Sequence, residues 1–374
     1  MRLFGRSRPL NLALQGGGAH GAYTWGVLDR LLEDDRVEPG WLSGTSSGSV
    51  NAAALASGWT LGGRDKAREV LAGVWKDIAG AGVPDFVKLN PFYSTLSRSS
   101  TMAQMASMFS PYDFNPMGFD PLRSVLETWI DFKAIRQRSS IELIIPATDA
   151  RTGQARFFNT REISVETVMA SSCLPALHQA VEIDGESYWD GGFSSNPDVL
   201  GLAKASPVRD TMIVQLTPLK RAQVPTNSHG ISDHVYHLAF LAPLIRDIEI
   251  IENCREACGG GLGIMPRSSG PGRVADHRFH VIDATPHTVS MDWSSKVNPE
   301  WDTFQKLFEA GREDATAWLE KYFNDIGRRE TIDLRKHFLA RSDVPALTLP
   351  KPPGEIDDDG HDAAMGTVMA GNAP

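Results

Sequence analysis

A short apolar run followed by three consecutive glycines constrains the fold of this chain most strongly. Residues 12 to 28 read LALQGGGAHGAYTWGVL, which predicts a strand, a glycine loop and a helix. Gly16, Gly18 and Gly21 have the G-x-G-x-x-G spacing of a dinucleotide-binding loop, whose bare backbone N–H groups approach a pyrophosphate. The same groups at a helix N-terminus also suit an oxyanion. The loop therefore predicts an anion-binding strand-loop-helix unit and leaves its ligand open.

A dinucleotide site also needs an acidic residue at the end of the second strand, where it binds a ribose hydroxyl. Glu33, Asp34 and Asp35 lie before that strand, at the end of the helix. The strand itself continues as GWLSGTSSG over residues 40 to 48 and contains no acid. The missing acid disfavours a dinucleotide ligand.

The second strand ends in a G-x-S-x-G sequence, Gly44-Thr45-Ser46-Ser47-Gly48. In a nucleophile elbow, this sequence turns sharply from a strand into a helix, and the glycines prevent clashes beside an exposed serine hydroxyl. The positive end of the next helix favours negative charge at that point. The alternative is a serine- and glycine-rich turn that only caps the helix. The pattern makes Ser46 the candidate nucleophile.

A serine nucleophile needs an oxyanion hole. The candidate donors are the backbone N–H groups of Gly16, Gly17 and Gly18 in the glycine loop, and that of Ser47 directly after the nucleophile. Removing one such donor typically costs about 3 to 4 kcal/mol of transition-state stabilisation. This cost explains why side chains would be excluded from the loop.

The candidate general base is Asp190, which ends a short strand in YWDGGFSSNP and is followed by Gly191 and Gly192. A carboxylate at a strand end, released by a flexible turn, can reach a serine on another strand. An ordinary aspartate has a pKa of about 3.9, so this base would need partial burial to raise it. The alternative is a simple Asp-Gly β-turn.

The three motifs together resemble those of the patatin-like phospholipase family. The match covers about residues 10 to 220 and runs in the family's order: Gly16 to Gly18 with Gly21, then Gly44 to Gly48, then Asp190 to Gly192. The resemblance implies an α/β fold of three layers, α/β/α, around a mainly parallel central sheet. It also implies a Ser46–Asp190 dyad without a histidine, and no metal or cofactor.

The same resemblance implies a lipid acyl hydrolase, such as a phospholipase or lysophospholipase, that works through an acyl-enzyme. One position departs from the family, which often has an arginine where this chain has His20. Any help from His20 to an oxyanion would depend on pH, because histidine titrates near neutrality. Lipid headgroup, acyl position and chain length stay open, as does acyl transfer to an acceptor other than water.

Two other functions stay open. The first is an α/β-hydrolase esterase with a Ser-His-Asp triad. Its histidine would come from a group without a distinctive local motif: His229, His234, His237, His277, His280 and His287. Only two strands precede Ser46, which counts against that fold. The second is a lipid- or nucleotide-binding module that kept the loop without the chemistry.

Alternating strand and helix patterns predict the organisation of the chain. We expect a catalytic domain over 10–220, with the sheet ending at the strand near 212–219. An apolar insertion or cap, rich in methionine and phenylalanine, is expected over about 75–132. It is a candidate contact for an acyl chain or a membrane surface. A mainly helical extension over 225–340 and a disordered tail over 341–374 would follow.

Composition excludes several classes of protein. The net charge of −9 over 374 residues argues against nucleic acid as a partner. The apolar run after the basic N-terminal residues is too short for an export signal, and the uncharged stretch 39–63 is too polar to cross a bilayer. Cys173, Cys254 and Cys258 form no disulfide or zinc pattern. We therefore expect a cytoplasmic protein, with peripheral membrane contact at most; the oligomeric state stays open.

Overall fold

The computed structural model describes residues 7–81, 110–115, 117–118, 120–221, 223–259, 270–291 and 300–340. The described residues up to Leu339 belong to one compact unit. The stretch 82–109 of the expected insertion and the expected tail over 341–374 lie outside the described residues.

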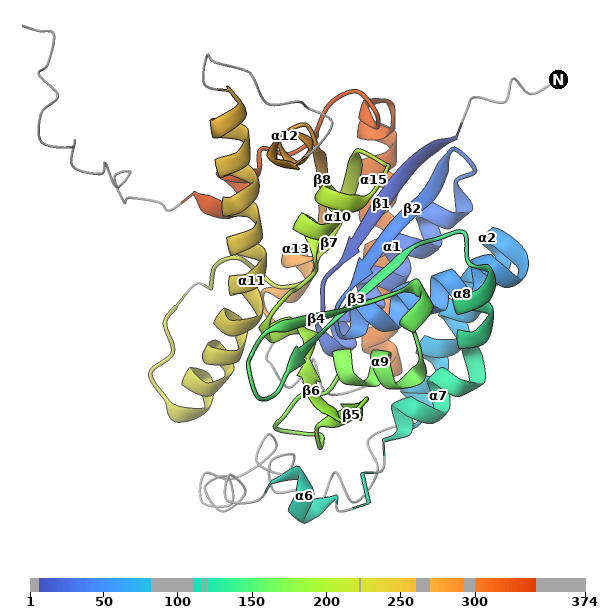
Figure 1. The fold of residues 1–374 in the computed structure, drawn as a ribbon, viewed down its shortest axis with the longest axis vertical. Coiled ribbons are helices and arrows are strands. Elements are labelled where there is room, and N and C mark those ends of the chain that lie inside the picture. Colours follow the sequence, from blue (N-terminus) through green and yellow to red (C-terminus); the bar gives the residue numbers. More distant parts are fainter. Residues whose placement is uncertain are drawn as a thin grey trace, which may run out of the picture. The chain divides into compact units, whose positions relative to one another are not determined.

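A single sheet forms the centre of this unit (Figure 1), and in the described residues it has eight strands. Their order is β5-β6-β3-β2-β1-β7-β8, and β4 pairs with β3. The pairs that join β3, β2, β1, β7 and β8 are all parallel, whereas β4, β5 and β6 pair antiparallel. The strands are β1 (Arg8–Leu14), β2 (Val37–Gly44), β3 (Leu143–Asp149), β4 (Ala155–Asn159), β5 (Val181–Ile183), β6 (Glu186–Asp190), β7 (Asp210–Gln215) and β8 (Arg278–Asp283).

Helices cover both faces of the sheet, so the expected three-layer α/β/α fold with a mainly parallel sheet is confirmed. One helical layer consists of α1 (Gly21–Glu33), α2 (Ser47–Ala81), α7 (Pro121–Trp129), α8 (Phe132–Arg138), α9 (Val165–Ser171) and α15 (Trp301–Tyr322). The other consists of α10 (Val199–Ala205), α11 (Ser228–Gly259) and α12 (Gly270–Ala275). Short helices are α6 (Pro111–Phe114), α13 (Thr285–Thr288), η1 (Gly18–His20), η2 (Thr160–Glu162), η3 (Gly191–Phe193), η4 (Phe323–Asp325) and η5 (Arg335–Leu339).

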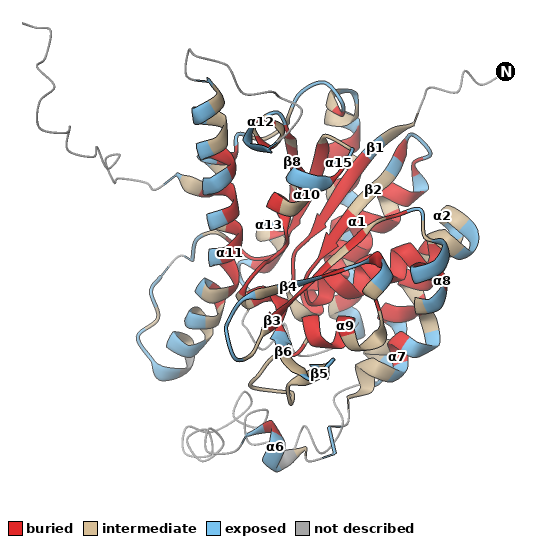
Figure 2. Ribbon diagram, in the orientation of Figure 1, coloured by how far each residue is buried: buried red, intermediate tan, exposed pale blue. Residues whose placement is uncertain are grey.

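The strand sequences explain why the sheet is covered on both sides. Neighbouring residues of a strand point to opposite faces. In β7, Met212 and Val214 join the core beneath α1 and α2, whereas Ile213 joins the core beneath α10 and α11. Both sets are fully buried, and Figure 2 shows the central strands in red. A sheet with two apolar faces is stable only between two helical layers.

The C-terminal region contributes to this sheet. The expectation that the sheet ends near residue 219 is wrong, because β8 pairs with β7 in parallel along its whole length. The apolar residues of HRFHVIDA, 277–284, predict the strand itself, but a single strand after a long helix carries no local sign of its partner. In the same region, α15 packs against α1, and the Phe308 ring lies 4.0 Å from the Trp25 ring between centroids.

The first residues of the expected insertion belong to α2. Trp75 is almost fully buried, and its indole N–H donates to Asn51 Oδ1 at 2.9 Å, which links the second half of α2 to the first. Helix α2 is interrupted at Gly62 and Gly63, where the backbone leaves helical geometry. None of the helices in the described residues combines the length and the apolar character needed to cross a bilayer.

Candidate active site

The G-x-S-x-G sequence forms a sharp turn between β2 and α2. Ser46 has a φ of 54°, which is the left-handed region that residues with a side chain rarely adopt. A Cβ at Gly44 would collide with the backbone of Gly48, and a Cβ at Gly48 would collide with the backbone of Leu14 in β1. The Ser46 N–H donates to Ser171 Oγ at 3.1 Å. The local geometry is that of a nucleophile elbow.

The glycine loop lies directly against this turn. A Cβ at Gly16 would come within 2.9 Å of Ser46 Cβ, so the loop and the serine are in van der Waals contact. The Gly16 N–H donates to Asn196 Oδ1 at 2.8 Å, and the Gly17 N–H donates to Ser47 Oγ at 3.1 Å. These two of the four predicted oxyanion donors are therefore already hydrogen-bonded.

The other two predicted donors are the backbone N–H groups of Gly18 and Ser47. No described residue accepts a hydrogen bond from the N–H of Gly18 or from that of Ser47. Gly18 has a φ of 57°, which turns the loop sharply before α1. Ser47 is the first residue of α2, where backbone N–H groups have no partner within the helix. His20 is buried at the end of η1, directly after the loop.

Asp190 ends β6, which lies between β5 and β3 in the sheet, and is completely buried. One carboxylate oxygen, Oδ1, accepts the Gly192 N–H at 2.8 Å, whereas Oδ2 has no hydrogen-bond partner among the described residues. Burial raises the pKa of Asp190 to about 7, against the opposing effects of the Gly192 N–H and the Ser46 hydroxyl. Gly191 packs against the backbone of Pro146, and Gly192 against the Phe240 ring.

The structure thus brings the glycine loop, Ser46 and Asp190 together. The Ser46 hydroxyl is near enough to act on the pKa of the carboxyl, although the two side chains do not form a full hydrogen bond. Such contacts are often loose before substrate binds and tighten with it. A carboxylate with a pKa near neutrality can accept a proton from a serine hydroxyl whose charge is stabilised nearby.

Two buried residues beside the turn accept hydrogen bonds from the backbone of the site, and the sequence did not indicate them. Asn196 is fully buried; it accepts the Gly16 N–H and donates to the Phe240 carbonyl of α11 at 2.9 Å. It thereby ties the glycine loop to α11. Asn196 lies six residues after Asp190, in the same YWDGGFSSNP stretch, but nothing in the local sequence indicates that it binds the glycine loop. Ser171, on α9, is equally buried.

A further charged pair lies near Asp190. His178 Nδ1 is 3.1 Å from Asp120 Oδ2, and this carboxylate raises the pKa of His178 although burial acts against it. The positive charge of His178 in turn lowers the pKa of Asp190, as the weakest of the effects on that group. Sequence reasoning overlooked His178, because the pair forms between loops 58 residues apart.

The histidines considered for a triad are arranged differently. In the described part of the chain, no histidine hydrogen-bonds to either carboxylate oxygen of Asp190. His234 and His237 stack on each other in α11, with ring centroids 5.6 Å apart. The remaining described candidates have partners elsewhere: His277 with Thr211, His280 with Asp210 and His287 with Asp314. The side chain of His229 lies outside the described structure.

No site for a metal ion is found in the described residues, where no three histidine, cysteine or carboxylate side chains lie together in a group that could bind one.

No curated protein matches the sequence. The solved structures that are similar to the chain include the following two. VipD from Legionella pneumophila is 12% identical, with 85% of this chain and 67% of that chain covered, at a TM-score of 0.40. The type III effector protein ExoU is 16% identical, with 86% and 80% covered, at a TM-score of 0.25.

A family model described as patatin-like phospholipase matches residues 12–203. The matched stretch contains the glycine loop, the Ser46 turn and the Asp190 turn. Because it spans more than half of the 374 residues, the chain belongs to the patatin-like phospholipase family.

Proposed function

We propose that this protein is a lipid acyl hydrolase that cleaves carboxylic esters through a Ser46–Asp190 dyad. The observation that carries the proposal is the position of Ser46, in a strained left-handed turn beside a buried carboxylate, one oxygen of which has no partner in the described part of the chain. Strain of this kind persists where the surrounding structure enforces it, and it clusters at active sites. Membership of the family supports the same class of reaction.

In the first half of the reaction, the Ser46 hydroxyl attacks the ester carbonyl carbon and gives its proton to Asp190. The carbonyl oxygen becomes an oxyanion in the tetrahedral intermediate. When the intermediate collapses, the bond to the leaving alcohol breaks and Asp190 returns the proton to that alcohol. The acyl group is now esterified to Ser46.

In the second half, water attacks the acyl-enzyme while Asp190 accepts one of its protons. The second tetrahedral intermediate collapses to the free fatty acid, and the proton returns from Asp190 to Ser46 Oγ. Asp190 therefore alternates between base and acid, and a pKa near neutrality favours both directions of transfer.

Gly18 and Ser47 are the oxyanion donors that this geometry favours. Their N–H groups have no other acceptor among the described residues, whereas those of Gly16 and Gly17 are bonded to side chains. In this arrangement Gly16 and Gly17 hold the loop against Ser46, and Gly18 and Ser47 bind the charge.

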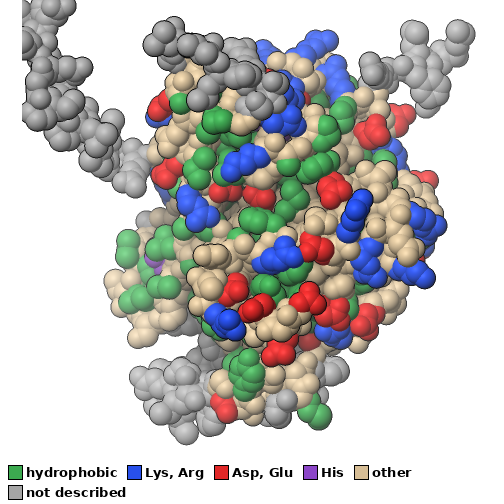
Figure 3. All heavy atoms as spheres, in the orientation of Figure 1, with side chains coloured by type: hydrophobic (Ala, Val, Ile, Leu, Met, Phe, Trp, Pro, Cys, Tyr) green, Lys and Arg blue, Asp and Glu red, His purple; other side chains and the backbone are tan. Residues whose placement is uncertain are grey.

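An apolar surface beside the site supports a lipid substrate and contact with a membrane. On α11, Ile231, Val235 and Leu238 are 48%, 59% and 51% exposed, at spacings that place them on one helix face. Figure 3 shows hydrophobic side chains gathered over the first half of α11. The Phe193 ring, beside the Asp190 turn, packs against Phe240 of the same helix at 4.8 Å between centroids.

A fluorophosphonate probe tests the nucleophile directly, because it forms a covalent bond only with an activated serine. We expect labelling of the wild-type protein and none of Ser46→Ala. The matched control is Ser232→Ala, an exposed serine on α11, which should be labelled like the wild type. Equal labelling of Ser46→Ala and wild type would overturn the assignment.

Measurements of kcat distinguish a Ser-Asp dyad from a Ser-His-Asp triad. We expect Asp190→Asn to lose at least about a thousandfold in kcat on a phospholipid panel and on p-nitrophenyl esters, as removal of a triad member does. Alanine variants of His234 and His237 should keep activity. A dead histidine variant would instead favour a Ser-His-Asp esterase, and a folded wild type without any turnover or labelling would favour a non-catalytic binding module.

A further inference from the structure

A cavity lies at the opposite end of the sheet from Ser46. It has a volume of about 740 Å³ and lies where β1, β7 and β8 begin. Arg8, Asp210 and Arg278 are the first residues of these parallel strands, whereas the glycine loop follows the last residue of β1. Seven residues of strand separate the two ends, which corresponds to about 20 Å.

The charged residues that line this cavity are almost all arginines, in a chain whose net charge is −9. They are Arg8, Arg36, Arg209, Arg278 and Arg328, with Asp210 as the one acid among the lining residues. Arg36, Arg209 and Arg278 pair with Asp34, Asp276 and Asp210, whereas Arg8 and Arg328 have no carboxylate partner in the described structure. The cavity therefore keeps an excess of positive charge, and a concave surface concentrates the field of such charges. The cavity is therefore suited to an anion.

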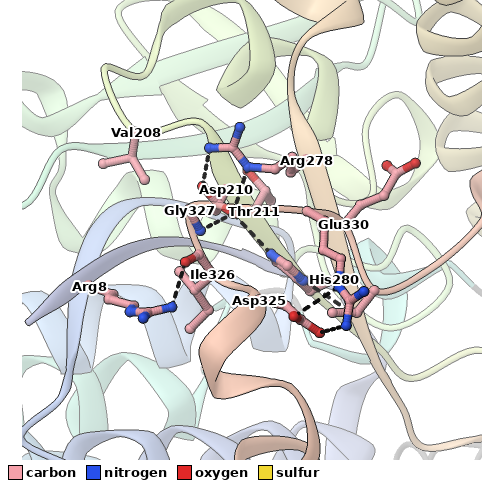
Figure 4. A network of polar contacts seen from close by, with 12 residues as sticks. Arg8, Val208, Asp210, Thr211, Arg278, His280, Asp325, Ile326, Gly327 and Glu330 are labelled. Carbon is pink, nitrogen blue, oxygen red and sulfur yellow. Dashed lines mark hydrogen bonds and ion pairs between the residues drawn. The ribbon is translucent and has the colours of Figure 1, made fainter.

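The negative charge of Asp210 is compensated, because both of its carboxylate oxygens accept hydrogen bonds from neighbouring residues. Arg278 binds it through Nε at 3.0 Å and Nη2 at 2.7 Å, and the Gly327 N–H and His280 also bond to Oδ1. Figure 4 shows this arrangement, with Arg278 forked over Asp210 and Arg8 reaching Ile326. Arg278 Nη1 has no acceptor among the residues described.

Two of the arginines lack a carboxylate partner in the described structure. Arg8 uses only Nη1, which donates to the carbonyls of Phe323, Asn324 and Ile326 at 3.1, 2.8 and 2.8 Å. Its Nε and Nη2 have no described acceptor. The side chain of Arg328 is exposed and forms no ion pair with any described residue.

The arginines on one wall are held in place before a ligand arrives. The guanidinium carbon of Arg8 lies 4.9 Å from the centroid of the Phe323 ring, and that of Arg36 lies 4.3 Å from it. Arg36 is also paired with Asp34 at 2.6 Å. Because the side chains are already ordered, an anion that binds them loses less entropy.

We propose that this cavity binds a phosphorylated small molecule, with the phosphate oxygens bonded to the spare donors of Arg8, Arg278 and Arg328. Guanidinium groups bind phosphate oxygens in pairs and are the preferred side chains for this purpose. The volume exceeds that of one phosphate group, and Pro9, Pro207 and Val208 provide an apolar wall for an organic portion. The ligand is thus of nucleotide size.

The test measures binding of pyrophosphate and AMP to the full chain by calorimetry at about 0.15 M salt, with adenosine as the uncharged control. The Ser46→Ala protein serves as a second sample, and its binding should be unchanged because the proposal does not depend on the hydrolase function. We expect Arg328→Gln to weaken the affinity for pyrophosphate about tenfold. The matched control is Arg329→Gln, whose arginine pairs with Asp325 and does not line the cavity.

Each outcome decides the proposal. Binding of the phosphates but not of adenosine, with loss in Arg328→Gln only, supports it. Competition for pyrophosphate by vesicles that contain phosphatidic acid identifies the phosphate as a lipid headgroup, and failure of these vesicles to compete identifies a soluble ligand. No binding of any phosphate, or equal loss in Arg328→Gln and Arg329→Gln, overturns it.

Discussion

The burial of Asp190 couples its chemistry to a cost in stability. Its pKa rises from the usual 3.8 of an aspartate to about 7 because water is excluded from the carboxyl. Between about pH 4 and pH 7, the folded protein therefore binds a proton that the unfolded chain has already released. The free energy of unfolding falls as the pH rises through this interval, and above it the buried charge persists. The same deprotonation produces the base that the reaction needs.

The pH dependence follows from this residue. We expect kcat/KM for a soluble ester to rise as the pH increases through about 7 and then to level off. In Asp190→Asn, the free energy of unfolding should increase by up to about 4 kcal/mol at pH 8, and by about 2 kcal/mol at pH 5. Urea unfolding at both pH values measures the change.

The control for this prediction is Asp65→Asn, an exposed aspartate on α2. Asp65→Asn should leave the free energy of unfolding unchanged at both pH 5 and pH 8. An equal effect of Asp190→Asn at pH 5 and pH 8 would contradict the assigned pKa.

At the scale of elements, the start of α2 is fitted tightly against β1. Gly48 is a helical residue, so by helix propensity alone an alanine would be favoured at this position. The carbonyl of Leu14 in β1 occupies the space that its Cβ would need. This close approach brings the N-terminus of α2, with the Ser47 N–H, next to the glycine loop that follows β1. The packing of one helix end therefore positions parts of both motifs.

A pair of glycines in the same helix tests this packing. We expect Gly48→Ala to lower the free energy of unfolding by about 3 kcal/mol, because the backbone of β1 or α2 must shift. Gly80→Ala, near the end of α2, should raise it by up to about 1 kcal/mol, since no described residue beyond the helix's own backbone lies within 4 Å of the added methyl group. Thermal unfolding of both variants gives the comparison. A neutral Gly48→Ala would show that the strand and the helix are not in close contact.

At the scale of the whole molecule, the C-terminal region completes the core. Strand β8 covers the edge of β7, and α15 covers α1, with Phe304 and Leu307 almost fully buried in the main core. The match to the family model ends at residue 203, yet the compact unit continues to Leu339. A catalytic domain that ends near residue 220 would expose a sheet edge and the apolar face of α1.

Truncation distinguishes the two boundaries. We expect a chain that ends at residue 223 to aggregate, because it lacks β8 and α15. A chain that ends at residue 340 should remain soluble, unfold cooperatively and be labelled by the fluorophosphonate like the full chain. Size-exclusion chromatography and circular dichroism measure solubility and folding. A soluble, cooperatively folded chain of residues 1–223 would show that the catalytic domain is independent.

Local patterns determined much of this protein in advance. The order of strand, glycine loop, helix and serine turn could be predicted because each depends on neighbouring residues: apolar periodicity forms the elements, and glycines permit the tight turns. The α/β class followed from the same alternation. The candidate pair Ser46 and Asp190 came from motif order and a family resemblance, and their roles stay a prediction.

Only the tertiary structure decided the relations between distant segments. Asn196 accepts a hydrogen bond from the Gly16 N–H, although the two residues are 180 positions apart in the sequence. Strand β8 pairs with β7, although the whole of α11 lies between them in the sequence. Nothing in either local sequence indicates these partners, because long-range contacts depend on how complete elements pack. For the same reason, the sequence offered four backbone donors to an oxyanion, and the folded chain leaves those of Gly18 and Ser47 without a described acceptor.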